Sequence, residues 1–255
     1  MTGVLPIALE ESRKIVQALL LSGKEYVCVM KLHREAEEKQ VKKTLEEFEG
    51  TIYQRPPLRA AVKRRLRTRR IYCIDFLEMD GRNVLFKVGC EAGTYIRKLC
   101  FDIGEVMGCA AHMQELRRTR AGPFAENGDM VTLHDVAYWF MEWQQQKDEN
   151  ILRKFIQPME KALVLVPKVY VRDSAVDAVC HGANLTAPGV LSVETEIGKG
   201  LTVAVLTLKG EVVALAKATA PTEDILNMEH GVVAEAKRVL MRRGTYLKCW
   251  KSGEV

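Results

Sequence analysis

The sequence contains no apolar run near the about 20 residues that a membrane-spanning helix needs. The N-terminus also lacks the basic stretch and long apolar segment of a secretory signal. Disorder is not indicated either, because 47% of the 255 residues are hydrophobic and 28% are charged. We therefore expect a folded, cytoplasmic protein with one large domain or, better suited to this length, two domains.

Patterns typical of disulfides and metal sites are absent as well. The seven cysteines are scattered, odd in number and never spaced as Cys-x-x-Cys, and the five histidines form no local cluster with Cys, Asp or Glu. We predict reduced thiols and no metal. Phosphate-binding glycine loops, Gly-x-Ser-x-Gly and metalloprotease motifs are also missing. Any chemistry must therefore depend on less generic residues.

What the sequence does contain is an unbalanced basic run. Eight Arg or Lys residues and no acidic residue lie between Arg55 and Arg70. A solvated charge run is the usual explanation of a short basic stretch, but it gives no reason for like charges without carboxylates. A polyanionic partner does, because basic side chains bind phosphates and release counterions. We expect this run to contact nucleic acid, with these candidate residues: Lys63, Arg64, Arg65, Arg67 and Arg69.

Hydrophobic periodicity and turn residues predict the elements of the first two thirds of the chain. Pro56-Pro57 should hold the basic run out from the core as a loop. The strand at 25–32 is apolar on both alternating faces, so we expect it to be central and covered on both sides. The predicted helices are 10–21, 35–49, 94–107 and 132–143, and the predicted strands are 25–32, 70–79 and 84–90.

Beyond Pro158 and Pro167 short strands and glycine turns dominate the sequence. A short helix capped by Asp173 should run to Cys180, followed by strands at 190–193, 201–208, 211–218 and 231–240. We place a domain boundary near Pro167, giving domains at residues 1–166 and 167–250. The fold class is α+β: a mixed-sheet core followed by a small, mostly β barrel or sandwich.

The chain opens on a nearly continuous apolar run, Gly3-Val4-Leu5-Pro6-Ile7-Ala8-Leu9, where termini are usually polar. Burial of each such side chain is worth about 1.5–3 kcal/mol. We therefore expect the run to need a covering surface, and Met1 to be an internal methionine of a longer protein. An upstream extension should make the chain more stable and less prone to aggregation.

Five segments in order resemble the motif series of the TruB family of pseudouridine synthases. They are Thr2–Pro6, Gly23–Tyr26, Tyr53–Lys63, Glu91–Arg97 and Glu115–Arg120. The arginine-rich loop is similar to that of the H/ACA branch, which contains dyskerin and the archaeal guide-RNA-dependent enzymes. The stretch from Ser174 to Leu185 resembles the start of a PUA domain. The resemblance covers essentially the whole chain, and it implies a pseudouridine synthase core with a PUA barrel.

The resemblance implies isomerisation of uridine to pseudouridine with no cofactor. The uridine is flipped out of RNA, an aspartate attacks the nucleoside, the glycosidic bond breaks, and the turned base is joined to the ribose through C5. Tyr26 matches the tyrosine that stacks on the target base, Arg97 the arginine that pairs with the aspartate, and Leu116 the apolar pocket residue. From residue type alone, Tyr26 and Leu116 are more often core residues, and Arg97 lies at the flank of the helix's buried stripe.

One departure from the family concerns the nucleophile. In the family it lies in Thr-Leu-Asp-Pro, directly before the segment that matches Thr2–Pro6. None of Asp75, Asp80, Asp102, Asp129 and Asp135 has that context. We therefore expect the nucleophile upstream of Met1 and the 255-residue chain to be inactive. A non-catalytic RNA-binding scaffold is the alternative, favoured if Met1 is a true start, and the synthase motifs disfavour a third option, a ribosome-associated PUA protein.

The PUA-like segment implies binding of the ACA end of a guide RNA. We expect contacts from His181, Gly182, Ala183 and Asn184, because glycine admits RNA close to the backbone and asparagine can read base edges. A simple helix-ending turn explains these residues equally well. The implied partners are an H/ACA guide RNA, an rRNA substrate or tRNA uridine 55, and small H/ACA particle proteins. The absence of dyskerin-like Lys-rich tails favours an archaeal source.

Overall fold

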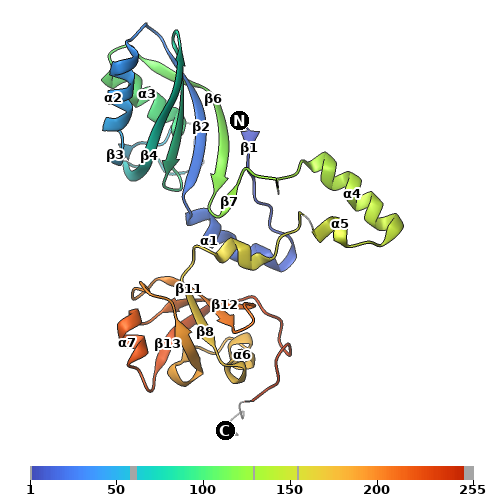
Figure 1. Cartoon of the computed structure of the whole chain (residues 1–255). Coiled ribbons are helices and arrows are strands. Elements are labelled where there is room, and N and C mark those ends of the chain that lie inside the picture. The colour runs from blue at the N-terminus through green and yellow to red at the C-terminus, as the bar shows by residue number, and fades with distance from the viewer. Residues whose placement is uncertain (1, 58–61, 129, 154, 250–255) are drawn as a thin grey trace. The chain divides into compact units, whose positions relative to one another are not determined.

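Figure 1 shows the chain as a computed structural model that describes residues 2–57, 62–128, 130–153 and 155–249. It contains two compact units. Unit 1 comprises Met1–Pro6 and Leu20–Phe155, and unit 2 comprises Ile7–Leu19 and Ile156–Val255. The segment Ile7–Leu19 thus packs with the C-terminal part of the chain, which no sequence pattern indicated.

Unit 1 is built on a mixed sheet with the strand order β1-β6-β2-β5-β4-β3, and β7 pairs with β6. β1 runs parallel to β6, and the other neighbours are antiparallel. Along β5 every second residue is buried, which is the period of a pleated strand with one covered face. The bounds are β1 Thr2–Gly3, β2 Lys24–Leu32, β3 Gly50–Gln54, β4 Arg67–Asp80, β5 Asn83–Cys90, β6 Ala111–Ala121 and β7 Phe124–Ala125.

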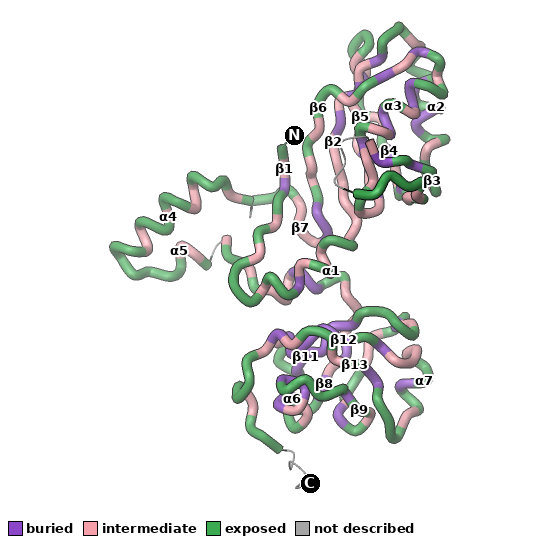
Figure 2. Tube along the Cα trace, turned by 180° about the vertical axis from the view of Figure 1, so that it is seen from behind, coloured by how far each residue is buried: buried purple, intermediate pink, exposed green. Residues whose placement is uncertain are grey.

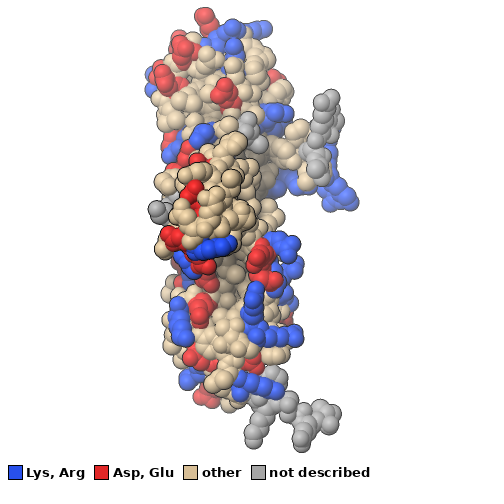
Figure 3. Space-filling model, turned by 90° about the vertical axis from the view of Figure 1, so that its right-hand side faces the viewer, with Lys and Arg blue, Asp and Glu red and all other residues tan. Residues whose placement is uncertain are grey.

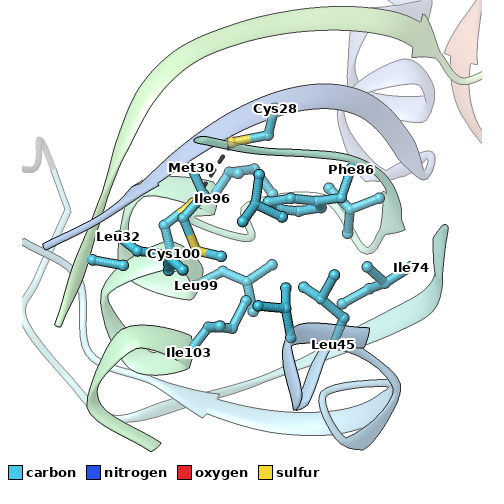
Figure 4. Packing of buried hydrophobic residues seen from close by; sticks show 14 of the residues in the cluster. Cys28, Met30, Leu32, Leu45, Ile74, Phe86, Ile96, Leu99, Cys100 and Ile103 are labelled. Atoms are coloured by element: carbon cyan, nitrogen blue, oxygen red, sulfur yellow. Dashed lines mark hydrogen bonds between the residues drawn. The ribbon is translucent and has the colours of Figure 1, made fainter. Parts of the chain in front are cut away.

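Two amphipathic helices, α2 (Glu38–Glu47) and α3 (Ile96–Val106), form the core of unit 1 with the sheet. Figure 4 shows Leu45 of α2 and Leu99 and Ile103 of α3 pointing at Met30 and Phe86 of the sheet. α3 approaches the sheet closely, since a Cβ on Gly104 would lie 2.2 Å from the Ala111 backbone nitrogen. These contacts fix α3 against β6.

β2 is central, as predicted, but the expectation that both its faces are covered is wrong. Cys28, Met30 and Leu32 are fully buried, whereas Val27 and Val29 on the opposite face are only half-buried. Figure 2 shows buried and intermediate residues together in the strands of unit 1, β2 among them. The helices that supply the core, α2 and α3, pack on the Met30 side, so apolar residues on the other face have less cover.

The basic run is only partly a loop, which corrects the sequence prediction. β4 begins at Arg67, so Arg67 to Arg70 form ladder pairs with Gln54 to Thr51 of β3. Lys63 to Leu66 carry no regular secondary structure, and Leu58 to Ala61 of the third motif lie outside the described residues, as does Asp129. The sequence prediction missed β3, although this strand contains the β-branched residues Thr51 and Ile52 and the aromatic Tyr53, which favour strands.

α4 (Leu133–Gln146) and α5 (Asn150–Arg153) complete unit 1. Thr132 caps α4 and Asp135 closes a capping box with it, which explains why the helix begins there. Trp139 stacks on Phe155 with ring centroids 5.0 Å apart. The predicted helix at 132–143 is therefore present and extends by three residues to Gln146.

Unit 2 contains a mixed sheet with the order β10-β8-β11-β12-β13-β9. The N-cap of α6 is Arg172 rather than the predicted Asp173, which is the first helical residue.

The helices and mixed sheets of the two units confirm the predicted α+β class. The bounds are η1 Glu10–Ile15, α1 Val16–Leu21, which continues into unit 1, η2 Met159–Leu163, β8 Lys168–Val171, α6 Asp173–Cys180, β9 Leu185–Thr186, η3 Ala187–Gly189, β10 Val190–Val193, β11 Thr202–Thr207, β12 Val212–Ala218, α7 Thr222–Leu226 and β13 Val232–Val239.

The apolar run at the start of the chain has mixed burial. Val4 is buried with 5% exposure, whereas Leu5, Ile7 and Leu9 are 69%, 62% and 53% exposed. Val106, the last residue of α3, is also exposed at 62%, whereas Cys100 and Gly104 are among the buried residues of that helix.

Candidate functional site

Tyr26 and Leu116 lie on the same face of the unit 1 sheet. Tyr26 of β2 is opposite Arg118 of β6, and Cys28, two residues along β2, is opposite Leu116. Residues directly opposite in a ladder place their side chains on one face. Both side chains are half-buried against the hydrophobic core. The fold therefore brings these two predicted site residues together at the rim of the core.

The Tyr26 hydroxyl lies near charged and polar side chains at the edge of the core. Burial raises the pKa of the Tyr26 hydroxyl, nearby Cys90 adds to the rise, and the Arg118 guanidinium acts in the opposite direction. Burial lowers the pKa of Lys24, and repulsion from Arg118 adds to that effect. Cys90, opposite Lys24, has its pKa raised to about 11 by burial. At neutral pH Tyr26 is therefore an uncharged ring with cationic neighbours, which suits stacking on a base of a polyanion.

Arg118 also fixes the start of the chain. Its backbone oxygen accepts a 2.8 Å hydrogen bond from the Val4 nitrogen, and its Nε donates to the Val4 oxygen at 2.6 Å. Gly3, with φ of +106°, lies so close to Arg118 that a Cβ would be 2.1 Å from the Arg118 oxygen. Lys24 and Arg118 belong to two of the five motif segments but are not among the predicted site residues. Their position beside Tyr26 becomes visible only when the β2–β6 register is known.

Arg97 occupies the first turn of α3, two residues after the N-cap Tyr95. Its side chain is exposed. Within the described part of the chain it has no hydrogen-bond or ion-pair partner, so its guanidinium is open to a ligand. The flank position expected from the helical period agrees with this exposure.

The five basic candidates differ in exposure and in their contacts. Lys63, Arg64 and Arg65 are exposed ahead of β4. Arg67 donates to the Lys63 oxygen at 3.2 Å. Arg69 is mostly buried with 20% side-chain exposure, its Nη1 lies 3.7 Å from Glu91 Oε1, and its Nε is buried without a partner among the described residues. The first three therefore face solvent as RNA contacts require, whereas Arg69 holds β4 against the Glu91 segment.

In unit 2 the expected RNA loop lies beside a basic cavity. The cavity of about 320 Å³ is lined by His181 and Gly182 together with Lys14, Arg242 and Arg243, among others. Lys14, Arg242 and Arg243 lie far from His181 in the sequence, so no local pattern indicates that they line the same cavity. Figure 3 shows basic and acidic side chains intermixed over the face in view, so such local groups of cations, rather than overall charge, mark candidate RNA contacts.

The other loop candidates differ in how they could serve RNA. Gly182 has φ of +90° and open space where a Cβ would be, so the glycine is required by the backbone and leaves room for a ligand. The Asn184 Oδ1 accepts a 3.2 Å hydrogen bond from the Ala236 nitrogen. That oxygen is engaged within the fold, so base reading by Asn184 would use its amide NH₂.

A cavity of about 590 Å³ between α2 and β4 is the larger of the two described here, but it contains none of the predicted site residues. Its charged lining is Glu38, Lys42, Glu46 and Glu78, which is mostly acidic and unsuited to RNA. Among the described residues no group of three or more His, Cys, Asp or Glu side chains is placed to hold a metal. None of the described helices is both long enough and apolar enough to span a bilayer.

Three family models match consecutive parts of the chain. The TruB family pseudouridylate synthase N-terminal domain matches residues 33–96, the tRNA pseudouridylate synthase B C-terminal domain matches 97–164, and the PUA domain matches 167–240. Together they extend from α2 to the end of unit 2's sheet.

Curated relatives and solved structures agree with these matches. The chain is 56% identical to the probable tRNA pseudouridine synthase B of Methanopyrus kandleri, covering 98% of this chain and 73% of that protein. It is 53% identical to the protein of that name from Pyrococcus abyssi, covering 98% and 75%. It superposes with a TM-score of 0.91 and 48% identity on a chain of an H/ACA RNP bound to a substrate RNA containing 2′-deoxyuridine, covering 97% and 75%. It superposes on a chain of a Cbf5-Nop10-Gar1 complex with a TM-score of 0.92 and 51% identity, covering 94% of this chain and 73% of that chain.

Proposed function

Because the chain belongs to the TruB family of pseudouridine synthases, we propose that it is the catalytic subunit of an H/ACA guide-RNA particle that converts uridine to pseudouridine. The observation that carries this proposal is its similarity, at 48–51% identity and TM-scores of 0.91–0.92, to chains solved in H/ACA assemblies. Ribosomal RNA is the proposed main substrate and tRNA uridine 55 a second one. The proposed partners are an H/ACA guide RNA and small particle proteins, in an archaeal cytoplasm.

The residues are proposed to act as the family resemblance implies. Tyr26 stacks on the flipped base, Leu116 lines the apolar side of its pocket, and Arg97 pairs with the family's nucleophilic aspartate. The shared face of Tyr26 and Leu116 supports these roles, as does the lack of a partner for Arg97 among the described residues. We propose residues 1–166 as the synthase domain and 167–250 as the PUA domain, which the matches at 33–164 and 167–240 support.

Guide dependence is the sharpest test of this function. The chain would be titrated with an H/ACA guide RNA ending in ACA, with the same RNA carrying a scrambled ACA, and with tRNA alone. We expect the ACA guide to bind at least about tenfold more tightly than the scrambled guide, since each lost base contact costs about 1–3 kcal/mol. Equal affinity for both guides would contradict a guide-RNA role and would favour direct tRNA binding.

We further propose that the 255-residue polypeptide alone makes no pseudouridine. Covalent catalysis needs a nucleophilic carboxylate, and no aspartate of this sequence lies in the Thr-Leu-Asp-Pro context. The assay is tritium release from [5-³H]uridine RNA in the presence of guide RNA and particle proteins. Release above background would refute inactivity. RNA binding without release would fit both a catalytic fragment and the alternative, a non-catalytic RNA-binding scaffold.

A further inference from the structure

One buried side chain connects the basic run to the helix that carries Arg97. Gln54, the last residue of β3, is 2% exposed. Its Nε2 donates to the Tyr95 oxygen at 3.2 Å, and its Oε1 accepts from the Tyr95 nitrogen at 3.0 Å. A single amide thus bonds both backbone groups of the N-cap residue of α3, two positions before Arg97, and it shares the Tyr95 oxygen with the Lys98 and Leu99 nitrogens. The amide thereby joins the end of β3 to the start of α3.

β4, the strand that follows the basic run, is hydrogen-bonded to the segment just before Tyr95. Glu91 accepts at Oε2 from the Arg70 nitrogen at 3.0 Å, and its own nitrogen donates to the Arg70 oxygen at 2.8 Å. Arg69 lies over Gly93, where a Cβ would be 3.2 Å from its Nη2. Residues 91–95 therefore contact both strands, through Gln54 of β3 and through Arg69 and Arg70 of β4.

The two strands that flank the basic run, β3 and β4, pair in one ladder, so a restraint on one strand acts on the other. Gln54 is paired with Arg67 in the β3–β4 register, and the exposed cations Lys63, Arg64 and Arg65 lie just before Arg67. An RNA that binds these cations restrains the β3–β4 ladder at its open end. Because the ladder is hydrogen-bonded to Tyr95 and Glu91, that restraint reaches the first turn of α3.

We propose that Gln54 is a positioning residue that couples RNA binding at Lys63, Arg64 and Arg65 to the placement of Arg97. This inference rests on the proposed function, in that RNA is the ligand of the basic run. Because Gln54 is buried, we expect it to act through Tyr95 and not by touching RNA or the reacting base. Coupling between two sites is reciprocal, so a base bound beside Arg97 also tightens RNA binding at the basic run.

The test uses the whole chain with an H/ACA guide RNA annealed to a short uridine-containing target. Hydrogen exchange would be followed in peptides covering residues 94–99, with a β2 peptide covering 27–32 as the reference. The variant Gln54→Met keeps the length of the side chain and removes both hydrogen bonds. The matched control is Gln114→Met, since Gln114 is exposed in β6.

Coupling predicts that RNA slows exchange in 94–99 by about fivefold or more in the wild type and in Gln114→Met, but not in Gln54→Met. The salt dependence of RNA binding should be unchanged in Gln54→Met, because the exposed cations remain. Equal RNA-induced protection of 94–99 in wild type and Gln54→Met would overturn the proposal. Absence of protection in a wild type that does bind RNA would overturn the coupling alone, whereas absence of ACA-dependent binding would overturn the proposed function itself.

A second variant, Gln54→Glu, separates positioning from loss of folding. A neutral carboxyl can donate to the Tyr95 oxygen and accept from its nitrogen, whereas a carboxylate can only accept. RNA-induced protection of 94–99 should therefore appear at low pH and disappear as the introduced carboxyl ionises, with the β2 peptide unchanged. The wild type serves as the control, in which RNA-induced protection of 94–99 should not change with pH. If this protection is equally independent of pH in Gln54→Glu, the proposed role of the amide is contradicted.

Discussion

The Nε of Arg118 donates a 2.6 Å hydrogen bond to the carbonyl oxygen of Val4, and the Val4 nitrogen donates back to the Arg118 oxygen at 2.8 Å. Arg118 is at the same time opposite Tyr26 in the β2–β6 ladder. One residue therefore connects the start segment Thr2–Val4 with the proposed base-stacking tyrosine. In the family that segment directly follows the nucleophile's motif, so this connection bears on how the pocket is assembled.

Replacing Arg118 by Ala should raise the pKa of Tyr26 further, because Arg118 opposes the rise caused by burial and Cys90. The measurement is NMR titration of ¹³Cζ-labelled tyrosine, with Tyr26→Phe to assign the signal. Arg117→Ala is the control, since Arg117 pairs with Glu126 on the exposed side. A Tyr26 pKa that is unchanged in Arg118→Ala would show that the guanidinium does not face the hydroxyl.

The raised pKa of Tyr26 also predicts the direction of a pH effect on stability. An unfolded tyrosine ionises near pH 10, and the folded one only at higher pH. The folded state therefore binds more protons in that interval, so this contribution to stability is intact below about pH 10 and is lost as pH rises through the folded pKa. Urea unfolding of the wild type should lose stability more steeply across this interval than that of Tyr26→Phe, and equal slopes would contradict the burial of the hydroxyl.

The basic run should divide into RNA-binding and structural arginines. Arg64→Ala with Arg65→Ala should lower the slope of log K against log salt by about 1.4–1.8, at roughly 0.7–0.9 per phosphate contact, with little change in stability. Arg69→Ala should instead lower the free energy of unfolding by about 1–2 kcal/mol, because Arg69 is largely buried beside Glu91. Filter binding over a salt series and thermal melts separate the two. A stability loss in the first variant, or none in Arg69→Ala, would reverse the assignment.

The sequence predicted elements whose pattern is local. The strands near 25–32, 84–90 and 190–193 and the helix at 173–180 lie within a residue or two of their predicted bounds, because alternation, caps and glycine turns act within a few residues. β6 was left unassigned, since His112, Gln114, Glu115 and Arg117 interrupt its apolar positions and it is stabilised by pairing with β2 and β1. Local propensity does not carry that information.

The candidate site was predictable to the extent that residue type and motif were enough. Tyr26, Arg97 and Leu116 could be nominated, but the association of Tyr26 with Lys24, Cys90 and Arg118 depends on strand register, which the sequence does not specify. Likewise Lys14 lines the cavity with His181 because Ile7–Leu19 packs within unit 2. Contacts between residues far apart in sequence depend on the tertiary fold, and these were the ones missed.

Gly182→Ala should destabilise unit 2 by about 1–3 kcal/mol through backbone strain alone. Gly182 has φ of +90°, and, its chain neighbours aside, no atom of the described residues lies within 4 Å of the position that a Cβ would take, so no steric clash with them contributes. Gly182→Asn should cost less, because asparagine adopts left-handed conformations more readily. The measurement is the thermal melt of each variant. An Ala variant as stable as the wild type would mean that the loop relaxes without strain.

The cations around His181 give the last prediction. Arg242→Ala with Arg243→Ala should weaken binding of an ACA-ended guide RNA about tenfold and lower its salt slope, because these side chains line the cavity beside His181 and Gly182. Lys237→Ala with Arg238→Ala is the matched control, since both are exposed cations of β13 that do not line this cavity. For a guide RNA with a scrambled ACA, the cavity variant and the control should differ less in affinity. An equal loss of affinity in both variants would mean that the cavity contributes only general charge, and the ACA end would then have to be sought on another surface of unit 2.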